Sequence, residues 1–288
     1  MATRTSLQSV KKRISKKSCF FCVFAIWCLI SVLCFIISVG CECNQKRIPA
    51  LHQAVTFGSV EMVSNLIRKG APINELDNRG RTPLYLSSLY GNYEIAELLI
   101  RNGANVSIQS RWKSAATPLM VAAQSGNMQI VQLLVNNGAM IDEKSKAGNT
   151  ALHFAAWTMN VEIVKYLLCH GADPNALNRV GNTPLNMEYL HELESKDPYE
   201  QIVSLLVDNG ASASNVNKFG RTPLHDACEI GNEHAVVFLL DHGANITKGS
   251  SHYLAPVELA RRNNYPNIVD IITNREKTLD NRGRLQHN

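Results

Sequence analysis

The chain has 288 residues, of which 45% are apolar and 18% are charged, so it is not a disordered chain. Its formal charge of +5 is accounted for by six basic and no acidic residues within positions 1–40, which leaves the rest of the chain close to neutral. A near-neutral body lacks the excess of Lys and Arg that neutralises a phosphate backbone, which argues against a nucleic-acid partner.

The first 47 residues divide into three parts. Residues 1–17 form a basic tail, and the stretch from Ser18 to Cys41 has 24 residues without a charge. At ~1.5 Å per residue such a helix spans a bilayer core of ~30 Å. We therefore expect residues 18–40 to be a transmembrane helix or uncleaved signal anchor, followed by a short linker at 41–47. The basic residues before it predict a single-pass membrane protein with a cytosolic N-terminus.

Two other fates of this segment stay open. Ser38-Val39-Gly40-Cys41 resembles a bacterial lipobox, which would make Cys41 a lipidation site, although Ser38 departs from the usual branched apolar residue. An ordinary cleaved secretory signal is the other alternative, but the apolar run is longer than the 7–15 residues typical of one. Unpaired thiols in the body favour a reducing compartment and weigh against export.

The rest of the chain is repetitive. Six glycines, each followed directly by Ala, are spaced by 33, 35, 33, 39 and 33 residues. They are Gly70, Gly103, Gly138, Gly171, Gly210 and Gly243. Five threonines followed by Pro-Leu or Ala-Leu are spaced by 35, 33, 33 and 39 residues, namely Thr82, Thr117, Thr150, Thr183 and Thr222. Two markers that share a period and its interruptions predict about seven repeated units over residues 48–273, with a polar tail at 274–288.

Each unit is expected to hold two short helices. Thr-Pro is a typical helix start, with the Thr as cap and the proline at the first helical position, and this applies to Pro83, Pro118, Pro184 and Pro223. A left-handed helix stop is expected nine residues after the cap, at Gly58, Gly91, Gly126 and Gly231. Met159 and Asn264 take that position in two units, and Met159 should be strained there.

The repeats resemble the ankyrin family. The matching phrases are Thr222-Pro223-Leu224-His225-Asp226-Ala227, Thr150-Ala151-Leu152-His153-Phe154-Ala155 and Gly171-Ala172-Asp173-Pro174-Asn175. The resemblance implies an all-α solenoid of helix pairs with β-turns that project to one side, and protein–protein binding without catalysis or a cofactor. It also implies that His52, His153 and His225 hydrogen-bond the turns rather than hold a metal.

Two insertions interrupt the period. Two extra residues between Gly103 and Thr117 lengthen one turn around Arg111-Trp112-Lys113. Six extra residues between Thr183 and Gly210 fall between the two helices of the fifth unit, where Asp197-Pro198 is expected to start the second helix.

The turn tips carry a row of basic and aromatic residues, which suits an acidic segment of a partner protein because Arg and aromatic side chains are strong anchors. The candidate partner-binding residues are Arg79, Arg111, Trp112, Lys113, Lys146, Arg179, Lys218, Phe219 and Tyr253. Acidic residues near them in the sequence are Glu75, Asp77, Asp142 and Glu143.

The sequence offers no active site. It contains neither a phosphate-binding Gly-x-x-x-x-Gly-Lys loop nor a Gly-x-Ser-x-Gly elbow, and His191-Glu192 lacks the second histidine of a zinc protease. We therefore expect no enzyme, no metal and no small-molecule substrate. The first hypothesis is a non-catalytic scaffold for protein–protein interaction, tethered to a membrane through residues 18–40. The alternative is a secreted or lipid-anchored effector that binds a target protein in another compartment.

Overall fold

The computed structural model describes residues 48–111, 114–187, 196–246 and 254–285. The predictions for the basic tail, the apolar segment 18–40 and Cys41 lie outside these residues. In the described ranges every regular element is a helix and there is no strand, as expected for an all-α fold. No helix within those ranges is both long enough and apolar enough to cross a membrane.

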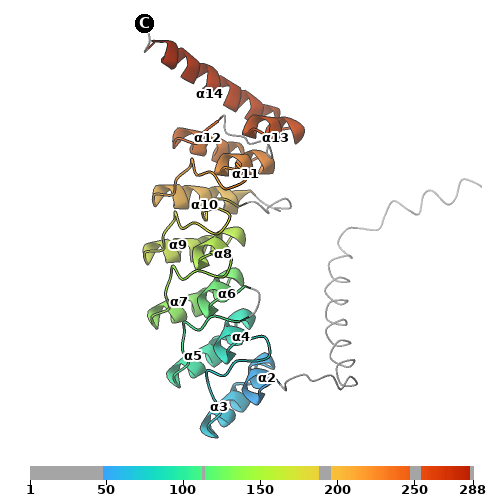
Figure 1. Ribbon diagram of the computed structural model, residues 1–288, viewed down its shortest axis with the longest axis vertical. Helices are drawn as coiled ribbons and strands as arrows, with labels where there is room; N and C mark the ends of the chain where they lie inside the picture. The colour runs from blue at the N-terminus through green and yellow to red at the C-terminus, as the bar shows by residue number, and fades with distance from the viewer. Residues whose placement is uncertain (1–47, 112–113, 188–195, 247–253, 286–288) are drawn as a thin grey trace, which may run out of the picture. The chain divides into compact units, whose positions relative to one another are not determined.

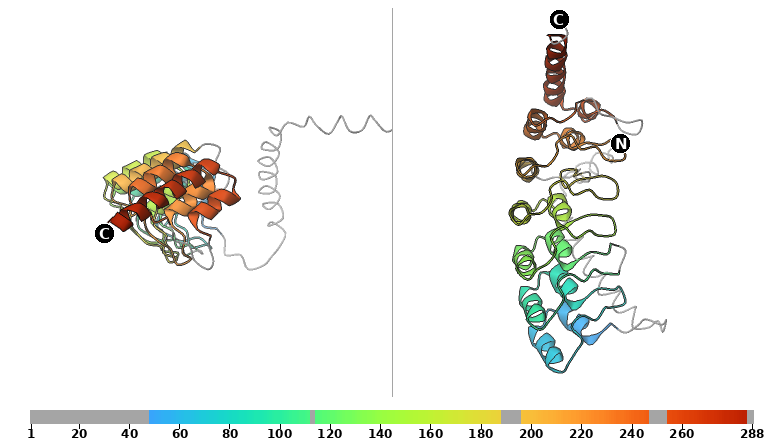
Figure 2. Two further views of the ribbon diagram at one scale, coloured as in Figure 1. Left: turned by 90° about the horizontal axis from the view of Figure 1, so that it is seen from above. Right: turned by 60° about the vertical axis from the view of Figure 1, so that its left-hand side comes forward.

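The helices form successive antiparallel pairs that stack in chain order (Figure 1). The right-hand view of Figure 2 shows the connecting turns gathered on one side of the helices. The pairs are α2 (Ala50–Thr56) with α3 (Val60–Arg68), α4 (Pro83–Tyr90) with α5 (Tyr93–Arg101), α6 (Pro118–Gln124) with α7 (Met128–Asn136), α8 (Ala151–Trp157) with α9 (Val161–Cys169), α11 (Pro223–Ile230) with α12 (Glu233–Asp241), and α13 (Pro256–Arg262) with α14 (Pro266–Leu285); α10 (Asp197–Asp208) is the second helix of the fifth unit.

The core runs through the stack between neighbouring units. In α9, Ile163 and Leu167 are 2% and 0% exposed, and equivalent side chains such as Leu99 and Leu134 are fully buried. Helices of this length are marginal alone, so each unit gains its stability by burying its apolar stripe against the next one. The predicted repeat architecture is confirmed.

Threonine is the N-cap residue of α4, α6, α8 and α11, as predicted. The hydroxyl of Thr82 accepts the N–H of Tyr85 (3.0 Å), which satisfies one of the free donors of the first turn. In the fourth unit, Nδ1 of His153 accepts the N–H of Thr150 (3.1 Å), and its Nε2 lies 3.2 Å from the carbonyl oxygen of Asn182. Burial lowers the pKa of His153 to about 4, so the imidazole is neutral and structural.

The left-handed helix stops are present where the spacing placed them. Gly91 has φ 74°, and the two substitutes, Met159 and Asn264, have φ 57° and 61°. A side chain at positive φ costs free energy, most of all for a residue such as Met159 that is neither Gly nor Asn. The predicted strain at Met159 is therefore present in the structure.

The fifth unit differs from the prediction. No described helix begins at Pro184; residues 184–185 form a turn instead. The side-chain oxygen of Asn186 accepts hydrogen bonds from the N–H (3.0 Å) and the hydroxyl (3.2 Å) of Thr183. These two bonds stabilise the turn. The second helix of the unit, α10, begins at Asp197 with Lys196 as its N-cap, one residue earlier than expected.

The C-terminal end also differs. The segment expected as a polar tail continues α14, which runs from Pro266 to Leu285. The beginning of α14 is anchored by Ile268 and Ile272, both fully buried, and by an ion pair between Arg275 and Asp241 of α12. Polar composition alone did not distinguish a solvated helix from an irregular tail.

Candidate partner-binding surface

The turn tips of successive units are joined by backbone hydrogen bonds. The N–H of Arg111 donates to the carbonyl oxygen of Gly80 (2.9 Å), and the N–H of Lys146 donates to that of Ser114 (2.8 Å). The next two links run from Arg179 to Ala147 and from Lys218 to Val180, both at 2.9 Å. In every link the donor residue is one of the predicted basic residues. We call the surface formed by Arg79, Arg111, Lys146, Arg179, Lys218 and Phe219 the tip row.

Two of the tips are also closed internally by the side chain of an Asn. Oδ1 of Asn178 accepts the N–H groups of Val180 and Asn182 (both 3.0 Å), and Oδ1 of Asn217 accepts those of Phe219 and Arg221 (both 2.9 Å). These are Asx-type turns, in which a side chain replaces a backbone partner. The backbone of these two tips is therefore held by contacts within the chain.

Neighbouring tips approach so closely that glycine is required between them. Gly80 has φ 69°, and a Cβ built on it would lie 2.3 Å from Cβ of Arg111. Gly148 has φ 84°, and its Cβ would lie 2.9 Å from the backbone nitrogen of Arg179. Both the positive φ and the close contact exclude a side chain at these positions.

The tip row is exposed. Arg79, Arg111, Lys146, Arg179 and Lys218 are all exposed, and Phe219 keeps 46% of its surface in solvent. Within the described residues, Arg111, Lys146, Arg179 and Lys218 make no ion pair. Their charges are therefore available to an outside ligand. The remaining predicted residues, Trp112, Lys113 and Tyr253, lie outside the described residues.

The nearby acidic residues do not all share this surface. Asp77 is 6% exposed, and its carboxylate binds Arg81 (2.7 Å) and two backbone N–H groups of its own tip. Burial alone would raise the pKa of Asp77, but the hydrogen bonds and charge of Arg81 outweigh it and the pKa is lowered. Glu143 accepts a hydrogen bond from the amide of Gln109 at 2.7 Å. Asp77 in particular does not neutralise the tip row.

Sequence reasoning missed two residues beside the tip row. Lys144 is exposed, and its Nζ donates to the carbonyl oxygen of Leu177 (3.0 Å) in the next unit. Leu177 is itself 49% exposed and directly precedes the Asn178 turn. Lys144 could have been found from its position two residues before Lys146, whereas the exposure of Leu177 depends on the stack.

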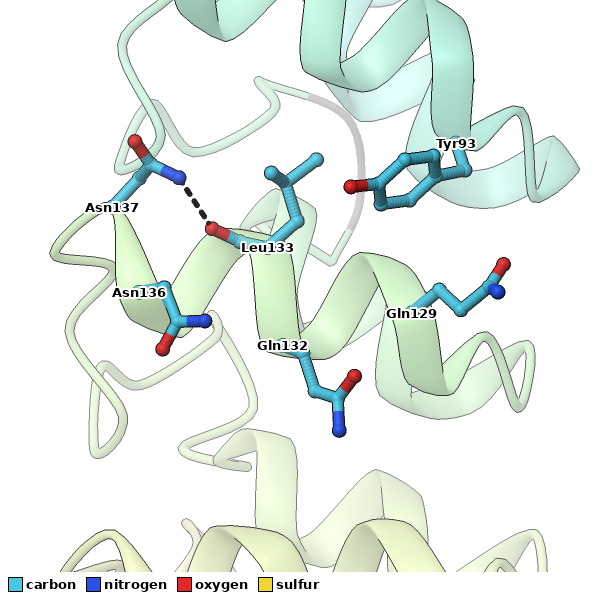
Figure 3. Close-up of a pocket in the computed structure, with 6 residues that line it drawn as sticks. All are labelled: Tyr93, Gln129, Gln132, Leu133, Asn136 and Asn137. Carbon is cyan, nitrogen blue, oxygen red and sulfur yellow. Dashed lines mark hydrogen bonds between the residues drawn. The ribbon is translucent and has the colours of Figure 1, made fainter.

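The outer helices carry a separate shallow groove of about 560 Å³ between α5 and α7 (Figure 3). Its lining is mostly amide side chains, and one of them, Asn137, donates to the carbonyl oxygen of Leu133 (2.7 Å). The lining residues are Tyr93, Gln129, Gln132, Leu133, Asn136 and Asn137. The groove holds no carboxylate, imidazole or thiol that could act as an acid, base or nucleophile.

Cys169 and Cys228 are the free cysteines of the described residues. Burial raises the pKa of the Cys228 thiol, which makes it an inert core residue rather than a nucleophile. In the part of the chain that the structure describes, no group of three or more His, Cys, Asp or Glu side chains could hold a metal ion.

Comparison with known proteins agrees with this geometry. The family model for ankyrin repeats (3 copies) matches residues 25–110, 108–178 and 191–282. The chain therefore belongs to the ankyrin repeat family, whose arrays are scaffolds for protein–protein interaction.

Individual relatives match shorter stretches. The human transient receptor potential cation channel subfamily A member 1 is 39% identical over 62 residues, which is 22% of this chain and 6% of the channel. Human protein phosphatase 1 regulatory subunit 27 is 39% identical over 62 residues, which is 22% of this chain and 40% of that protein. Ankyrin repeat domain-containing protein 13C of Xenopus tropicalis is 38% identical over 60 residues, 21% of this chain and 12% of its own. The chain thus matches less than half of each of these relatives.

Proposed function

We propose that this protein is a non-catalytic scaffold that binds an acidic segment of a partner protein along its tip row and is tethered to a membrane by residues 18–40. The observation that carries the binding part is the ladder of tip hydrogen bonds, which sets four unpaired cationic residues on successive tips. Because these hydrogen bonds already hold the backbone of the tips, binding of a partner loses little conformational entropy of this surface.

The chemistry of the tip row specifies its ligand. Lys and Arg attract carboxylates, while Phe219 and Leu177 offer exposed apolar area close to Lys218 and Arg179 in the sequence. An extended segment that alternates Asp or Glu with apolar residues would satisfy both features. The similarity to a protein named as a phosphatase regulatory subunit supports a binding role rather than catalysis.

The tether rests on the uncharged run from Ser18 to Cys41 and on the basic residues before it. In this proposal the protein is single-pass, with a cytosolic N-terminus. A lipid on Cys41 is the alternative anchor, and it would belong to the lipid-anchored effector. Carbonate extraction of membranes separates integral from peripheral proteins, and protease protection then reports which side holds the repeats. Full-length chain in the carbonate supernatant would contradict the tether.

The binding surface is tested by reversing its charge. The triple variant Lys146→Glu, Arg179→Glu, Lys218→Glu should weaken binding of synthetic Glu-rich peptides with interspersed Phe and Leu by about tenfold or more, a loss of about 1.4 kcal/mol. The matched control, Arg68→Glu, Lys69→Glu, Lys165→Glu, makes the same change in charge at exposed positions away from the tips. Equal loss of binding in both variants would show that net charge, not the tip row, attracts the peptide.

Trp112 is tested in the same assay. If Trp112→Ala leaves the melting temperature unchanged and weakens peptide binding, the indole belongs to the contact, as expected for an aromatic anchor. If it lowers the melting temperature while binding per folded molecule is unchanged, Trp112 packs the turn and is not part of the binding surface.

A further inference from the structure

The two ends of the repeat array are chemically different. At the N-terminal end, Met62 of α3 is 49% exposed, although the residues at the same position of later units are buried: Ile95 and Ile130 are 1% exposed, Ile163 is 2% exposed and Ile202 is fully buried. Leu66, one turn further along α3, is half-buried where its counterpart Leu99 is fully buried. The first unit therefore leaves an apolar stripe uncovered among the described residues.

The last unit shows which neighbour normally covers this stripe. Ile268 of α14 occupies the position of Met62 and is fully buried, although no described unit follows it. Cover for this position must therefore come from the preceding unit. The described residues contain no unit before α2, so Met62 faces outward at the N-terminal end of the array.

The C-terminal end carries polar residues instead. Arg261 of α13 stands where the fully buried Cys228 stands in the previous unit, and its side chain is 51% exposed. Repeat arrays need terminal units with a polar outer face. The last unit meets this requirement at Arg261, whereas the first unit does not meet it at Met62.

The first unit has other exposed apolar side chains besides Met62. Of the ten large apolar side chains exposed in the described residues, three lie within positions 48–62: Ile48 at 45%, Phe57 at 67% and Met62 at 49%. Two exposed cations, Arg68 and Lys69, end the same helix pair. Apolar side chains flanked by cations are the combination found at membrane interfaces. We call Ile48, Phe57, Met62 and Leu66 the first-unit surface.

The sequence brings this surface close to the proposed anchor. Only residues 41–47 separate the uncharged run from Ile48, and seven residues span at most about 25 Å. Lys46 and Arg47 within that linker add positive charge, which anionic headgroups attract. If residues 18–40 cross a bilayer, this linker keeps the start of the first unit within about 25 Å of the bilayer surface.

We propose that the first-unit surface rests on the lipid surface, so that the bilayer covers Met62 and Leu66 as a preceding unit covers the equivalent residues elsewhere in the array. This proposal rests on the membrane tether proposed above. It gives the array a defined attachment point at its N-terminal end, in addition to the covalent anchor.

The test places the photo-crosslinking residue p-benzoylphenylalanine at position 62 of the full-length chain. The protein is reconstituted into vesicles of phosphatidylcholine with a minority of phosphatidylserine, irradiated, and analysed by mass spectrometry. The matched control carries the same residue at position 262, which is exposed at the polar end of the array. We expect lipid adducts at position 62 in several times the yield found at position 262.

Each other product contradicts the proposal. A crosslink to residues 1–47 of the same chain would mean that the N-terminal segment covers the surface, and a crosslink between two chains would mean that a second copy does. Equal lipid yields at the two positions would mean that the face is solvated. Circular dichroism before reconstitution checks folding, and position 57 serves as a second probe if the variant at position 62 does not fold.

Vesicle flotation separates this proposal from the tether. If the chain does not float with the vesicles, the tether itself is wrong. If the chain floats and position 62 gives no excess of lipid adducts, the tether stands and only the contact of the first-unit surface is wrong.

Discussion

The carboxylate of Asp226 joins the fifth and sixth units through the backbone of Met187. Its Oδ2 accepts the N–H of Met187 at 3.0 Å, and its Oδ1 accepts from Nε of Arg221 at 2.6 Å. Arg221 also pairs with Glu229, and Asp226 is only 1% exposed. Met187 follows the turn that replaces a helix start at Pro184, so its N–H has no partner within a helix. Asp226 supplies that partner from the next unit.

Replacing Asp226 should be costly. Asp226→Ala leaves the buried Arg221 with one partner fewer and the Met187 N–H without an acceptor, and we expect a loss of about 3–5 kcal/mol in the free energy of unfolding. The double variant Arg221→Met, Asp226→Leu removes both charges and should lose less than the single variant. Urea unfolding measures both. A double variant that loses more than Asp226→Ala would show that the pair itself stabilises the protein.

Met159 offers a gain in stability. Its φ of 57° favours glycine, so Met159→Gly should raise the free energy of unfolding by about 1 kcal/mol, reduced by the packing that the Met side chain gives up. Met159→Ala loses the same packing and keeps the strain, so Gly should be the more stable of the two. Chemical denaturation of the pair isolates the backbone contribution. Equal stability would mean that the turn relaxes to negative φ.

Leu167 reports the strength of the stack. It is fully buried between units, and Leu167→Ala should cost about 2–4 kcal/mol because the cavity fills only in part. Leu177→Ala makes the same chemical change at a side chain that is 49% exposed and should fall within about 0.5 kcal/mol of wild type. The two melting temperatures are compared in one buffer. Similar losses at both positions would contradict the burial of Leu167.

His153 should make the array sensitive to acid. The pKa of His153 is about 4 in the folded protein, against 6.5 for an unperturbed histidine. Below pH 6.5 the unfolded chain therefore binds a proton at this residue, whereas the folded chain stays unprotonated until the pH approaches 4. Stability is therefore complete above pH 6.5 and falls toward pH 4, with a slope of up to about 1.4 kcal/mol per pH unit from this residue.

The variant His153→Met tests this contribution, because Met120 stands at the same position of the third unit. Between pH 7 and pH 5 it should lose about 2 kcal/mol less stability than wild type. The comparison uses each protein's own value at pH 7, which removes any effect of the substitution on packing. An unchanged pH dependence would mean that His153 is protonated in the folded state.

Periodicity was enough to predict most of the fold, because each unit is built from local signals. The Thr cap at Thr82 and the left-handed stop at Gly91 depend on neighbours in the same unit, so they can be read from the sequence. Lys146, Arg179 and Lys218 share one repeat position, four residues before the Thr of the next helix, and the structure gives them backbone links of the same kind. Their role in binding stays a prediction.

The features that were missed depend on residues in other units. After the turn at Pro184, the N–H of Met187 donates to the carboxylate of Asp226, which lies 39 residues further along the chain. No local sequence pattern predicts that contact. Asp77 is close to the candidate binding residues in the sequence, yet it is buried and its carboxylate binds Arg81. The continuation of α14 to Leu285 had no apolar stripe to reveal it.

The hydrogen bonds between neighbouring tips are made by backbone atoms alone. The bonds that hold the stack together therefore do not depend on which side chains the tips display. The N–H groups of Arg111, Lys146, Arg179 and Lys218 hold neighbouring tips together, whereas their side chains take no part in those bonds. Any residue other than proline can donate the same bond. If the tip row binds the partner as proposed, substitution at these positions can change the ligand while the backbone bonds are kept, so related arrays can acquire new partners on the same stack.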